Sequence, residues 1–287
     1  MIYSYGVSLP GTYHKKKNIA CQDSHKIISC GRHMAIAVVA DGLGSAEHAD
    51  IGAEMAVTVA ADYCHEHLTP KDGASQIKDT IRDSFYAALN AIEKTSAEKG
   101  HSIEQYDTTL TLAVLIRDTL YYGHSGDGGM IALTTKGDYE AVTTQQRDPE
   151  GRVFPLFFSD QWKFGQYGKK VSSVLLATDG MFEPFFPLYI KNEPVKIHVV
   201  LAQFFMDNRS LNIGKMGQRS VCTRISAFME SIPDEQVNDD KTVAVLINTA
   251  IKTRRQPKAY YKEPDWAELK KKYDDEWRKA AYPGLYK

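Results

Sequence analysis

The sequence has few cysteines and no spacing that would join them around a metal. Four cysteines occur in 287 residues, and no two have C-x-x-C spacing, which indicates free thiols in a reducing compartment. Long apolar runs are also missing, because no window approaches the 18 residues that a membrane helix needs. The N-terminal residues MIYSYGVSLPG lack the basic segment and apolar stretch of a signal peptide. We therefore expect a soluble, cytoplasmic protein.

Charge of one sign is equally scarce over the whole chain. Lys and Arg together number 35 and Asp and Glu 36, which gives a formal charge of −1. Such a balance offers no global attraction to nucleic acid or to an anionic membrane, so neither is expected as a partner. Any function that depends on charge must therefore be local.

Short apolar runs rich in β-branched residues predict strands, since most are bounded by Gly, Asp or Asn. The runs cover residues 2–7, 34–40, 110–116, 130–133, 174–177 and 243–246. Between the second and third of these runs, apolar residues recur every three or four positions over residues 47–67 and 74–99, which predicts two long helices.

The order of these elements predicts the fold class. Helices and strands form separate groups, and the short turn at residues 117–119 suits an antiparallel hairpin rather than a parallel crossover. An α+β layered fold is therefore favoured over a doubly wound sheet. Residues 185–230 have a helical pattern, interrupted at Asn208 and Gly214, and are predicted to form a lid or flank between two strands.

The composition changes near residue 250. Residues 251–287 contain 11 Lys or Arg and 6 Asp or Glu, so this segment carries +5 and the remainder −6. We predict one domain over residues 1–250 and a basic, aromatic C-terminal extension over 251–287, with Pro264 in the first turn of a helix. Its apolar stripe would be Trp266, Leu269, Tyr273 and Trp277. The extension either packs on the domain or docks a partner or acidic substrate.

Aspartates follow or precede three of the predicted strands. Asp41-Gly42 ends the run 34–40, Asp179-Gly180 follows 174–177, and Asp239-Asp240 comes just before 243–246. One Asp-Gly pair after a strand is typical of an ordinary turn. Three acidic sites at strand ends would repel one another unless cations neutralise them, and oxygen ligands favour Mg²⁺ or Mn²⁺ over zinc.

These aspartates belong to a longer ordered series of short motifs between residue 1 and about residue 250. The motifs are Gln22-Asp23, Ala40-Asp41-Gly42-Leu43-Gly44, Asp107-Thr108-Thr109, Ser125-Gly126-Asp127-Gly128, Thr178-Asp179-Gly180-Met181 and Asp239-Asp240-Lys241-Thr242-Val243. Their order and spacing resemble those of the metal-dependent type 2C (PPM) serine/threonine protein phosphatases, in a divergent branch. Each motif alone is degenerate, whereas the ordered set is specific.

The resemblance implies an α-β-β-α sandwich in which two central antiparallel sheets are flanked by helices, with two Mn²⁺ or Mg²⁺ ions at one end. By position, Asp41 would bridge both ions, the carbonyl of Gly42 would bind one, and Asp179 and Asp240 would bind the other. Asp23 would hold water on the metal.

The same resemblance implies a further, weaker metal site for which Asp127 and Glu183 are candidates. It also implies the reaction, in which a bridging hydroxide hydrolyses phosphoserine or phosphothreonine. No phosphoenzyme is needed, which fits the absence of a C-x₅-R signature from the sequence. The expected partners are a phosphoprotein substrate and the serine/threonine kinase that modifies it.

Two alternatives remain open. A pseudophosphatase could keep the fold as a binding or scaffold module, although it would have no chemical reason to retain so repulsive a cluster of carboxylates. A metal-dependent hydrolase of small phosphate esters is a second alternative, but no base-stacking or ribose-binding motif supports it.

The sequence departs from the family pattern at the residue that anchors the substrate phosphate. An arginine is usual about five residues before the first motif aspartate, and Asn18 stands there instead. We therefore predict that the basic run 14–17 binds the phosphate, with His14 as the leading candidate and Lys17 as another. Milder departures are Gln22 before Asp23, and Gly128-Gly129 where Ser-Arg is typical, a change expected to affect packing more than metal chemistry.

Overall fold

The structure is a computed structural model and describes residues 1–213 and 215–282. Its elements are β1 (Ile2–Leu9), α1 (Thr12–Lys17), β2 (Asp23–Ser29), β3 (Met34–Asp41), α2 (Ala49–His67), α3 (Ala74–Lys99), η1 (Ile103–Tyr106), β4 (Leu110–Ile116), β5 (Thr119–Ser125), β6 (Gly129–Thr134), β7 (Tyr139–Ala141), η2 (Ser159–Gln161), β8 (Lys163–Gln166), β9 (Val171–Ala177), α4 (Asp179–Phe182), η3 (Glu183–Phe185), η4 (Leu188–Ile190), α5 (Val199–Met206), α6 (Asn208–Leu211), α7 (Gln218–Glu230), β10 (Lys241–Asn248), η5 (Lys258–Tyr261) and α8 (Trp266–Ala281).

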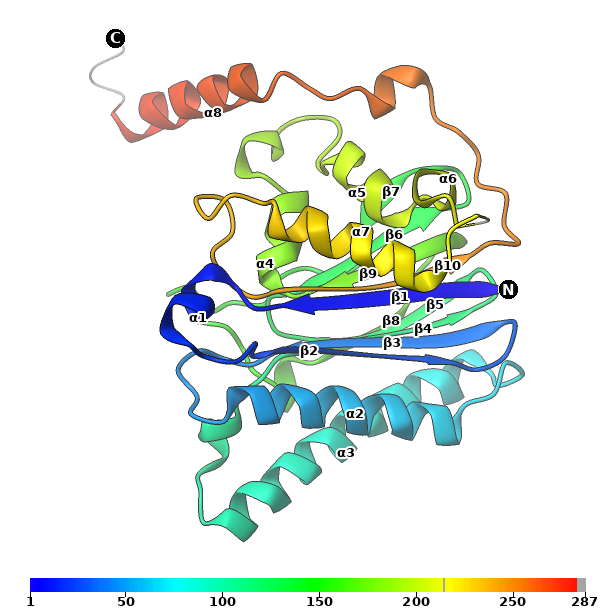
Figure 1. Cartoon of the computed structure of the whole chain (residues 1–287), viewed down its shortest axis with the longest axis vertical. Helices are drawn as coiled ribbons and strands as arrows, with labels where there is room; N and C mark the ends of the chain where they lie inside the picture. The colour runs from blue at the N-terminus through cyan, green and yellow to red at the C-terminus, as the bar shows by residue number, and fades with distance from the viewer. Residues whose placement is uncertain (214, 283–287) are drawn as a thin grey trace.

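Two five-stranded sheets form the centre of the molecule (Figure 1). One has the strand order β1-β10-β9-β6-β7 and the other β2-β3-β4-β5-β8. All the pairings in both sheets are antiparallel. Ile116 pairs with Thr119, so Arg117 and Asp118 alone connect β4 to β5, and the predicted tight hairpin is confirmed.

Helices cover the outer face of each sheet. Figure 1 shows α2 and α3 below the sheet that contains β3, while α4, α5 and α7 lie above the sheet that contains β1. The predicted α+β, four-layer α-β-β-α sandwich is therefore confirmed. No helix in the described parts of the chain combines the length and apolar character that a membrane crossing requires.

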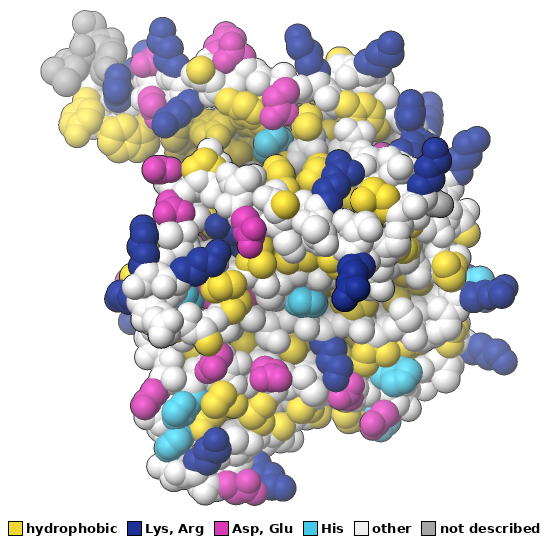
Figure 2. Space-filling model, viewed as in Figure 1, with side chains coloured by type: hydrophobic (Ala, Val, Ile, Leu, Met, Phe, Trp, Pro, Cys, Tyr) yellow, Lys and Arg dark blue, Asp and Glu magenta, His cyan; other side chains and the backbone are white. Residues whose placement is uncertain are grey.

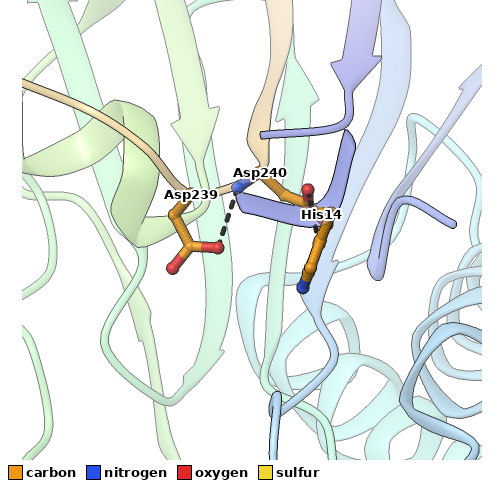
Figure 3. Close-up of side chains that lie close together, drawn as sticks. All are labelled: His14, Asp239 and Asp240. Atoms are coloured by element: carbon orange, nitrogen blue, oxygen red, sulfur yellow. Dashed lines mark hydrogen bonds and ion pairs between the residues drawn. The ribbon is translucent and has the colours of Figure 1, made fainter. Parts of the chain in front are cut away.

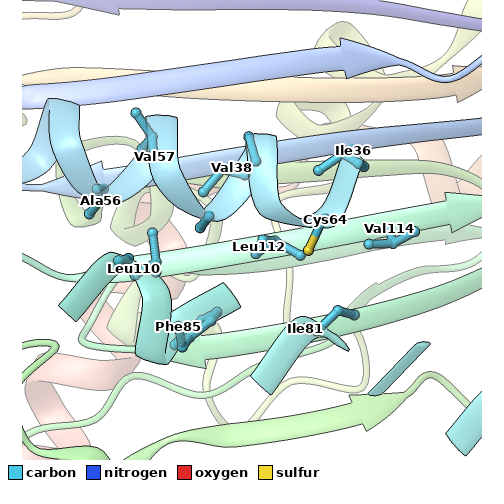
Figure 4. Packing of buried hydrophobic residues seen from close by; sticks show 14 of the residues in the cluster. Ile36, Val38, Ala56, Val57, Cys64, Ile81, Phe85, Leu110, Leu112 and Val114 are labelled. Atoms are coloured by element: carbon cyan, nitrogen blue, oxygen red, sulfur yellow. The ribbon is translucent and has the colours of Figure 1, made fainter. Parts of the chain in front are cut away.

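Each interface between layers has its own apolar core. Figure 4 shows the core between the sheet that contains β3 and helices α2 and α3, where Ile81 and Phe85 of α3 and Cys64 of α2 face Leu112 of β4. A second core joins the other sheet to α4, α5 and α7. Between the sheets the buried side chains include many small residues, such as Ala35, Ala37, Ala113, Ala132 and Ala244. Small side chains allow the two sheets to approach closely, which fixes the relative positions of their strand ends.

The strands without an apolar run escaped prediction. Strands β2, β7 and β8 lie at or next to sheet edges, and β2 (DSHKIIS) keeps most side chains half-buried. A strand with one solvated face needs no continuous apolar run, so the sequence contained little signal for it. The helical pattern breaks at Asp207, between α5 and α6, one residue before the interruption predicted at Asn208. The interruption predicted at Gly214 lies outside the described residues.

The C-terminal extension folds back over the helices above the β1 sheet (Figure 1). Its helix begins at Trp266, because Asp265 is the N-cap and accepts a hydrogen bond from the Glu268 N–H at 3.0 Å. Pro264 therefore precedes the helix instead of occupying its first turn. Trp266 packs against His198 and Tyr189, with ring centroids 4.6 and 5.8 Å apart.

The opposite end of the apolar stripe on α8 is open to solvent. Trp277 is 56% exposed, and α8 has no buried residue. Figure 2 shows Lys and Arg interspersed with Asp and Glu on the left and lower parts of this face, and mostly Lys and Arg along its upper right edge. The contacts of α8 with the domain thus lie in its first two turns, where Trp266 packs on His198 and Lys272 pairs with Glu193 at 2.7 Å.

Candidate active site

The antiparallel register places the first two motif aspartates directly opposite each other. Asp23 begins β2, Asp41 ends β3, and the two residues pair across the strands. Asp23 is buried and accepts a hydrogen bond from Thr178 Oγ1 at 2.7 Å. Thr178 follows β9 in the other sheet, so this hydrogen bond joins the two sheets at the end where the carboxylates gather.

Two further aspartates join Asp41 at this end of the sandwich. Asp127 lies in the turn between β5 and β6, and Asp179 is the first residue of α4, directly after β9. Each of the three can offer a carboxylate oxygen such that these oxygens all lie within 4.8 Å of one another. Asp41 and Asp127 are separated by 86 positions in the sequence, and Asp127 and Asp179 by 52, yet the three form one acidic cluster. The carboxylate oxygens of this cluster suit Mg²⁺ or Mn²⁺.

The backbone around Asp41 is held by the Asp-Thr-Thr motif. Thr109 Oγ1 accepts a hydrogen bond from the Asp41 N–H at 3.0 Å, while the Asp41 carbonyl accepts from Thr108 Oγ1 at 2.9 Å and from the Thr109 N–H at 2.8 Å. Gly42 forms a bridge with Thr108, and a Cβ there would lie 2.4 Å from the carbonyl oxygen of Ala49. Only glycine fits at this position, beside the start of α2.

Asp239 and Asp240 have different environments although they are neighbours in sequence (Figure 3). Asp240 is buried, and one of its oxygens accepts from the Gly11 N–H at 2.6 Å and contacts His14 Nδ1 at 2.8 Å. Its other oxygen accepts from the Gln22 N–H at 2.6 Å. Both oxygens of Asp240 are therefore already bound by protein donors.

Asp239, which the sequence reasoning did not select, is exposed. One oxygen accepts a hydrogen bond from the Asp240 N–H at 2.8 Å, and a carboxylate oxygen of Asp239 lies within 4.8 Å of ligand atoms of Asp240 and His14 (Figure 3). The negative charge of Asp239 contributes to the raised pKa of Asp41 and of Asp179. The signal in the sequence was the pair of adjacent aspartates, Asp239 and Asp240, since either of them could be the metal ligand.

The predicted phosphate-binding residues lie on α1 and have protein partners. The His14 ring is buried against Asp240. Lys17 is exposed, with Nζ 2.5 Å from Tyr13 Oη and 4.2 Å from the centre of that ring. The binding of a substrate phosphate by His14 or Lys17 therefore stays a prediction. The observed role of His14 is to hold Asp240 and the loop before β10.

Burial and mutual repulsion raise the pKa values of the carboxylates. Burial raises the pKa of Asp41 well above its usual range, and Asp23, Asp179, Asp127 and Asp239 raise it further. Burial, followed by the charges of Asp127 and Asp239, raises the pKa of Asp179 to about 7. Such shifts mean that the ionised cluster is destabilised when no cation is near. They also mark functional sites more often than ordinary surfaces.

One cation of the chain itself enters the cluster, and sequence reasoning missed it. Arg147, in the loop between β7 and η2, places Nη2 2.6 Å from Asp127 Oδ2, 3.2 Å from Glu183 Oε1 and 3.5 Å from Asp179 Oδ2. Nothing in the sequence distinguishes Arg147 from other surface arginines, because its contacts depend on the path of the loop.

The loss of the typical Ser-Arg pair has a packing explanation. A Cβ at Gly128 would lie 2.6 Å from the carbonyl oxygen of Ala177, and one at Gly129 would lie 2.4 Å from the ring of Phe182. The ring of Phe182 from α4 fills this place, while the expected small effect on metal chemistry stays a prediction.

A cleft of about 1080 Å³ extends from the acidic cluster toward the C-terminal extension. Asp179, Glu183 and Asp239 line one end, and Trp266 and Lys270 of α8 line another part of its wall. Figure 2 shows hydrophobic side chains gathered beneath the C-terminal helix. A peptide bound at the carboxylates could therefore contact both apolar and basic groups.

Comparisons with known proteins agree with this geometry. Residues 10–206, more than half of the chain, match the family model described as protein phosphatase 2C. No curated protein matches the chain. Among solved structures, a point-mutated bacterial serine phosphatase is 11% identical with a TM-score of 0.62, and the match covers 89% of this chain and 100% of that one.

Two other solved structures have the same fold. The S. agalactiae serine/threonine phosphatase is 14% identical with a TM-score of 0.61, covering 86% of this chain and 99% of that one. The catalytic domain of the serine/threonine protein phosphatase PstP, solved with two manganese ions, is 16% identical with a TM-score of 0.56, covering 86% and 97%. The chain therefore belongs to the protein phosphatase 2C family and is, by that membership, a protein serine/threonine phosphatase.

Proposed function

We propose that this chain hydrolyses phosphoserine and phosphothreonine in proteins with two Mn²⁺ or Mg²⁺ ions bound at the acidic cluster. The observation that carries the proposal is the convergence of Asp41, Asp127 and Asp179 within 4.8 Å at the end of the sandwich. The ligand atoms that these residues offer are all carboxylate oxygens, and the raised pKa values of Asp41 and Asp179 indicate a need for positive charge. The residues present thus fit hard divalent ions.

The ligands that we propose are Asp41, the carbonyl of Gly42, Asp179 and Asp239. The sequence prediction gave Asp240 the place that we now assign to Asp239. We make this change because both Asp240 oxygens accept hydrogen bonds from protein donors, whereas Asp239 adds its charge to that of Asp41 and Asp179. Asp240 then acts as a positioning residue that joins α1, the Gln22 loop and the start of β10.

Two ions, when bound, would lower the pKa of the attacking water and stabilise negative charge on the phosphoryl group. Asp23 lies opposite Asp41 and would orient the attacking water, while Thr178 holds the Asp23 carboxylate in place. The oxygen of water forms a bond to phosphorus as the bond to the serine or threonine oxygen breaks, and that oxygen leaves with a proton. The products are inorganic phosphate and the free hydroxyl side chain.

Hydrolysis of a phosphothreonine peptide that depends on Mn²⁺ is the expected result for the whole chain. At a free Mn²⁺ concentration about 100 times the dissociation constant, binding should also stabilise the fold by roughly 2.7 kcal/mol. Phosphate release and the thermal midpoint should both be measured with and without Mn²⁺, with EDTA as the control.

The two measurements separate the proposed enzyme from its alternatives. A raised midpoint without phosphate release from any substrate would favour the pseudophosphatase. Release from small esters alone, with none from phosphopeptides, would favour the hydrolase of small phosphate esters. The kinase that supplies the substrate and the cytoplasmic location stay predictions from the sequence.

We also propose that α8 helps to bind the phosphoprotein and is not needed for chemistry. Trp266 and Lys270 line the cleft that reaches the carboxylates, whereas α8 itself has no buried residue. The segment just before α8 is different, because Tyr260 Oη accepts a hydrogen bond from the Tyr139 N–H at 2.9 Å and packs on the core above the β1 sheet.

Removal of α8 should therefore affect a protein substrate more than a small one. A chain that ends at Lys262 is expected to keep turnover of an aryl phosphate within about twofold, because it retains Tyr260 and Tyr261, while KM for a phosphoprotein rises. A chain that ends at Asn248 is the comparison and should be less stable, since it loses both tyrosines. Loss of aryl phosphate turnover in the longer chain, with its fold intact, would contradict this assignment.

A further inference from the structure

We propose that Arg147 is a built-in cation that occupies the place of a third divalent ion, so that this chain binds two ions and no more. The inference rests on the proposed binuclear centre. Sequence resemblance suggests Asp127 and Glu183 as ligands of a third ion. In the structure the guanidinium of Arg147 lies between these two carboxylates, 2.6 Å from Asp127 Oδ2 and 3.2 Å from Glu183 Oε1.

Asp127 has a particular need for this partner. Its side chain is 1% exposed, and among the described residues no hydrogen-bond donor is directed at either carboxylate oxygen. The contact with Arg147 is therefore an ion pair, at 2.6 Å, in place of a directed hydrogen bond. A buried carboxylate that has neither water nor a cation is strongly destabilised, and Arg147 supplies the charge that a metal ion would otherwise supply.

The loop that carries Arg147 is fixed to the turn that carries Asp127. The Gln146 N–H donates to the Gly126 carbonyl at 2.9 Å, and the Gly126 N–H donates to Gln146 Oε1 at 3.1 Å. Gln145 Nε2 donates to the carbonyl of Asp127 itself at 2.8 Å. Beyond Arg147 the chain turns back, and Arg147 pairs with Val153. The backbone of Arg147 is thus held beside Asp127 by hydrogen bonds on both of its preceding residues.

Arginine suits this role better than a bound ion would in one respect. Its guanidinium stays charged at every physiological pH and has several donors in one plane, so one group can contact Asp127, Asp179 and Glu183 together. It also cannot dissociate when the free metal concentration falls. The region around Asp127 should therefore keep its charge balance at metal concentrations too low to fill a weak third site.

The test is the number of Mn²⁺ ions that the full chain binds, measured by titration calorimetry and by metal analysis after equilibrium dialysis. Wild-type protein should bind two ions. Arg147→Gln frees Asp127 and Glu183 and should bind three, the additional ion more weakly. Arg147→Lys keeps a positive charge and should bind two. Arg152→Gln is the matched control, because Arg152 lies in the same loop but pairs with Asp148 and Glu150.

The possible outcomes distinguish the role of Arg147 from the binuclear centre on which it rests. Three ions on the wild-type protein would overturn the role of Arg147 while leaving metal-dependent hydrolysis intact, as would an unchanged count of two on a folded Arg147→Gln variant. No ions on the wild-type protein would overturn the binuclear centre itself. If Arg147→Gln does not fold, the wild-type count and a crystal of the Mn²⁺-loaded wild-type protein still decide, because anomalous scattering beside Asp127 would show a third ion in place of the guanidinium.

Discussion

Replacing Asp41 with Asn is expected to reduce turnover of a phosphothreonine peptide by roughly 100-fold or more, which corresponds to about 3 kcal/mol of transition-state stabilisation. Asp41 is the aspartate that both pairs with Asp23 across the strands and lies within the cluster of Asp127 and Asp179. The substitution keeps the size of the side chain and removes a charge, so the loss should come from metal binding and not from packing.

The stability of the metal-free protein provides the internal control. Because the charges of Asp23, Asp179 and Asp127 destabilise ionised Asp41, the Asn variant should unfold at the same temperature as wild type or a higher one when EDTA is present. Its midpoint should respond less to Mn²⁺ than that of wild type. Asp160→Asn, at an exposed residue of η2, should change neither quantity. Turnover of Asp41→Asn within a few-fold of wild type would refute the assignment of Asp41.

The parts of the fold that could be predicted are those in which the pattern of apolar and polar residues indicates which side chains are buried. Strands β3, β4 and β10 are buried along nearly their whole length, and α3 alternates apolar and polar residues at helical spacing, so their positions followed from pattern alone. Edge strand β2 and the short helix α1 have mixed side chains and gave no such pattern.

The acidic cluster could be predicted in outline because an aspartate at the end of a strand lies at the edge of the sheet, and this position does not depend on the conformation of the loops. The partners of each carboxylate could not. Whether Asp239 or Asp240 faces the cluster depends on the direction of the chain as it enters β10, and one residue of difference reverses a side chain. Arg147 reaches Asp127 only because its loop is tied to the Gly126 turn, a tertiary contact that leaves no mark in the local sequence.

Opposite effects of Asp239→Asn and Asp240→Asn are the second large result that we expect. Asp239 is exposed and has one hydrogen bond, to a backbone N–H of its own loop. Its substitution should lower Mn²⁺ affinity and reduce turnover by roughly 100-fold, with little change in the free energy of unfolding. Asp240 is buried, with two backbone N–H donors and the His14 ring on its oxygens.

Asn at position 240 would direct an amide NH₂ at a backbone N–H or at His14, so one donor would lose its acceptor. Hydrogen bonds to charged groups contribute about 1.5 to 3 kcal/mol each, and the Asp240→Asn variant should therefore lose about that amount of stability in a urea titration without Mn²⁺. Any loss of its activity should be accompanied by this loss of stability. A His14→Gln variant is the matched comparison, because it removes one partner of Asp240 and should be destabilised in the same direction. If instead Asp240→Asn abolished Mn²⁺ binding at unchanged stability while Asp239→Asn behaved like wild type, Asp240 would be the ligand, as the sequence first suggested, and its contacts with Gly11, His14 and Gln22 would have to open when metal binds.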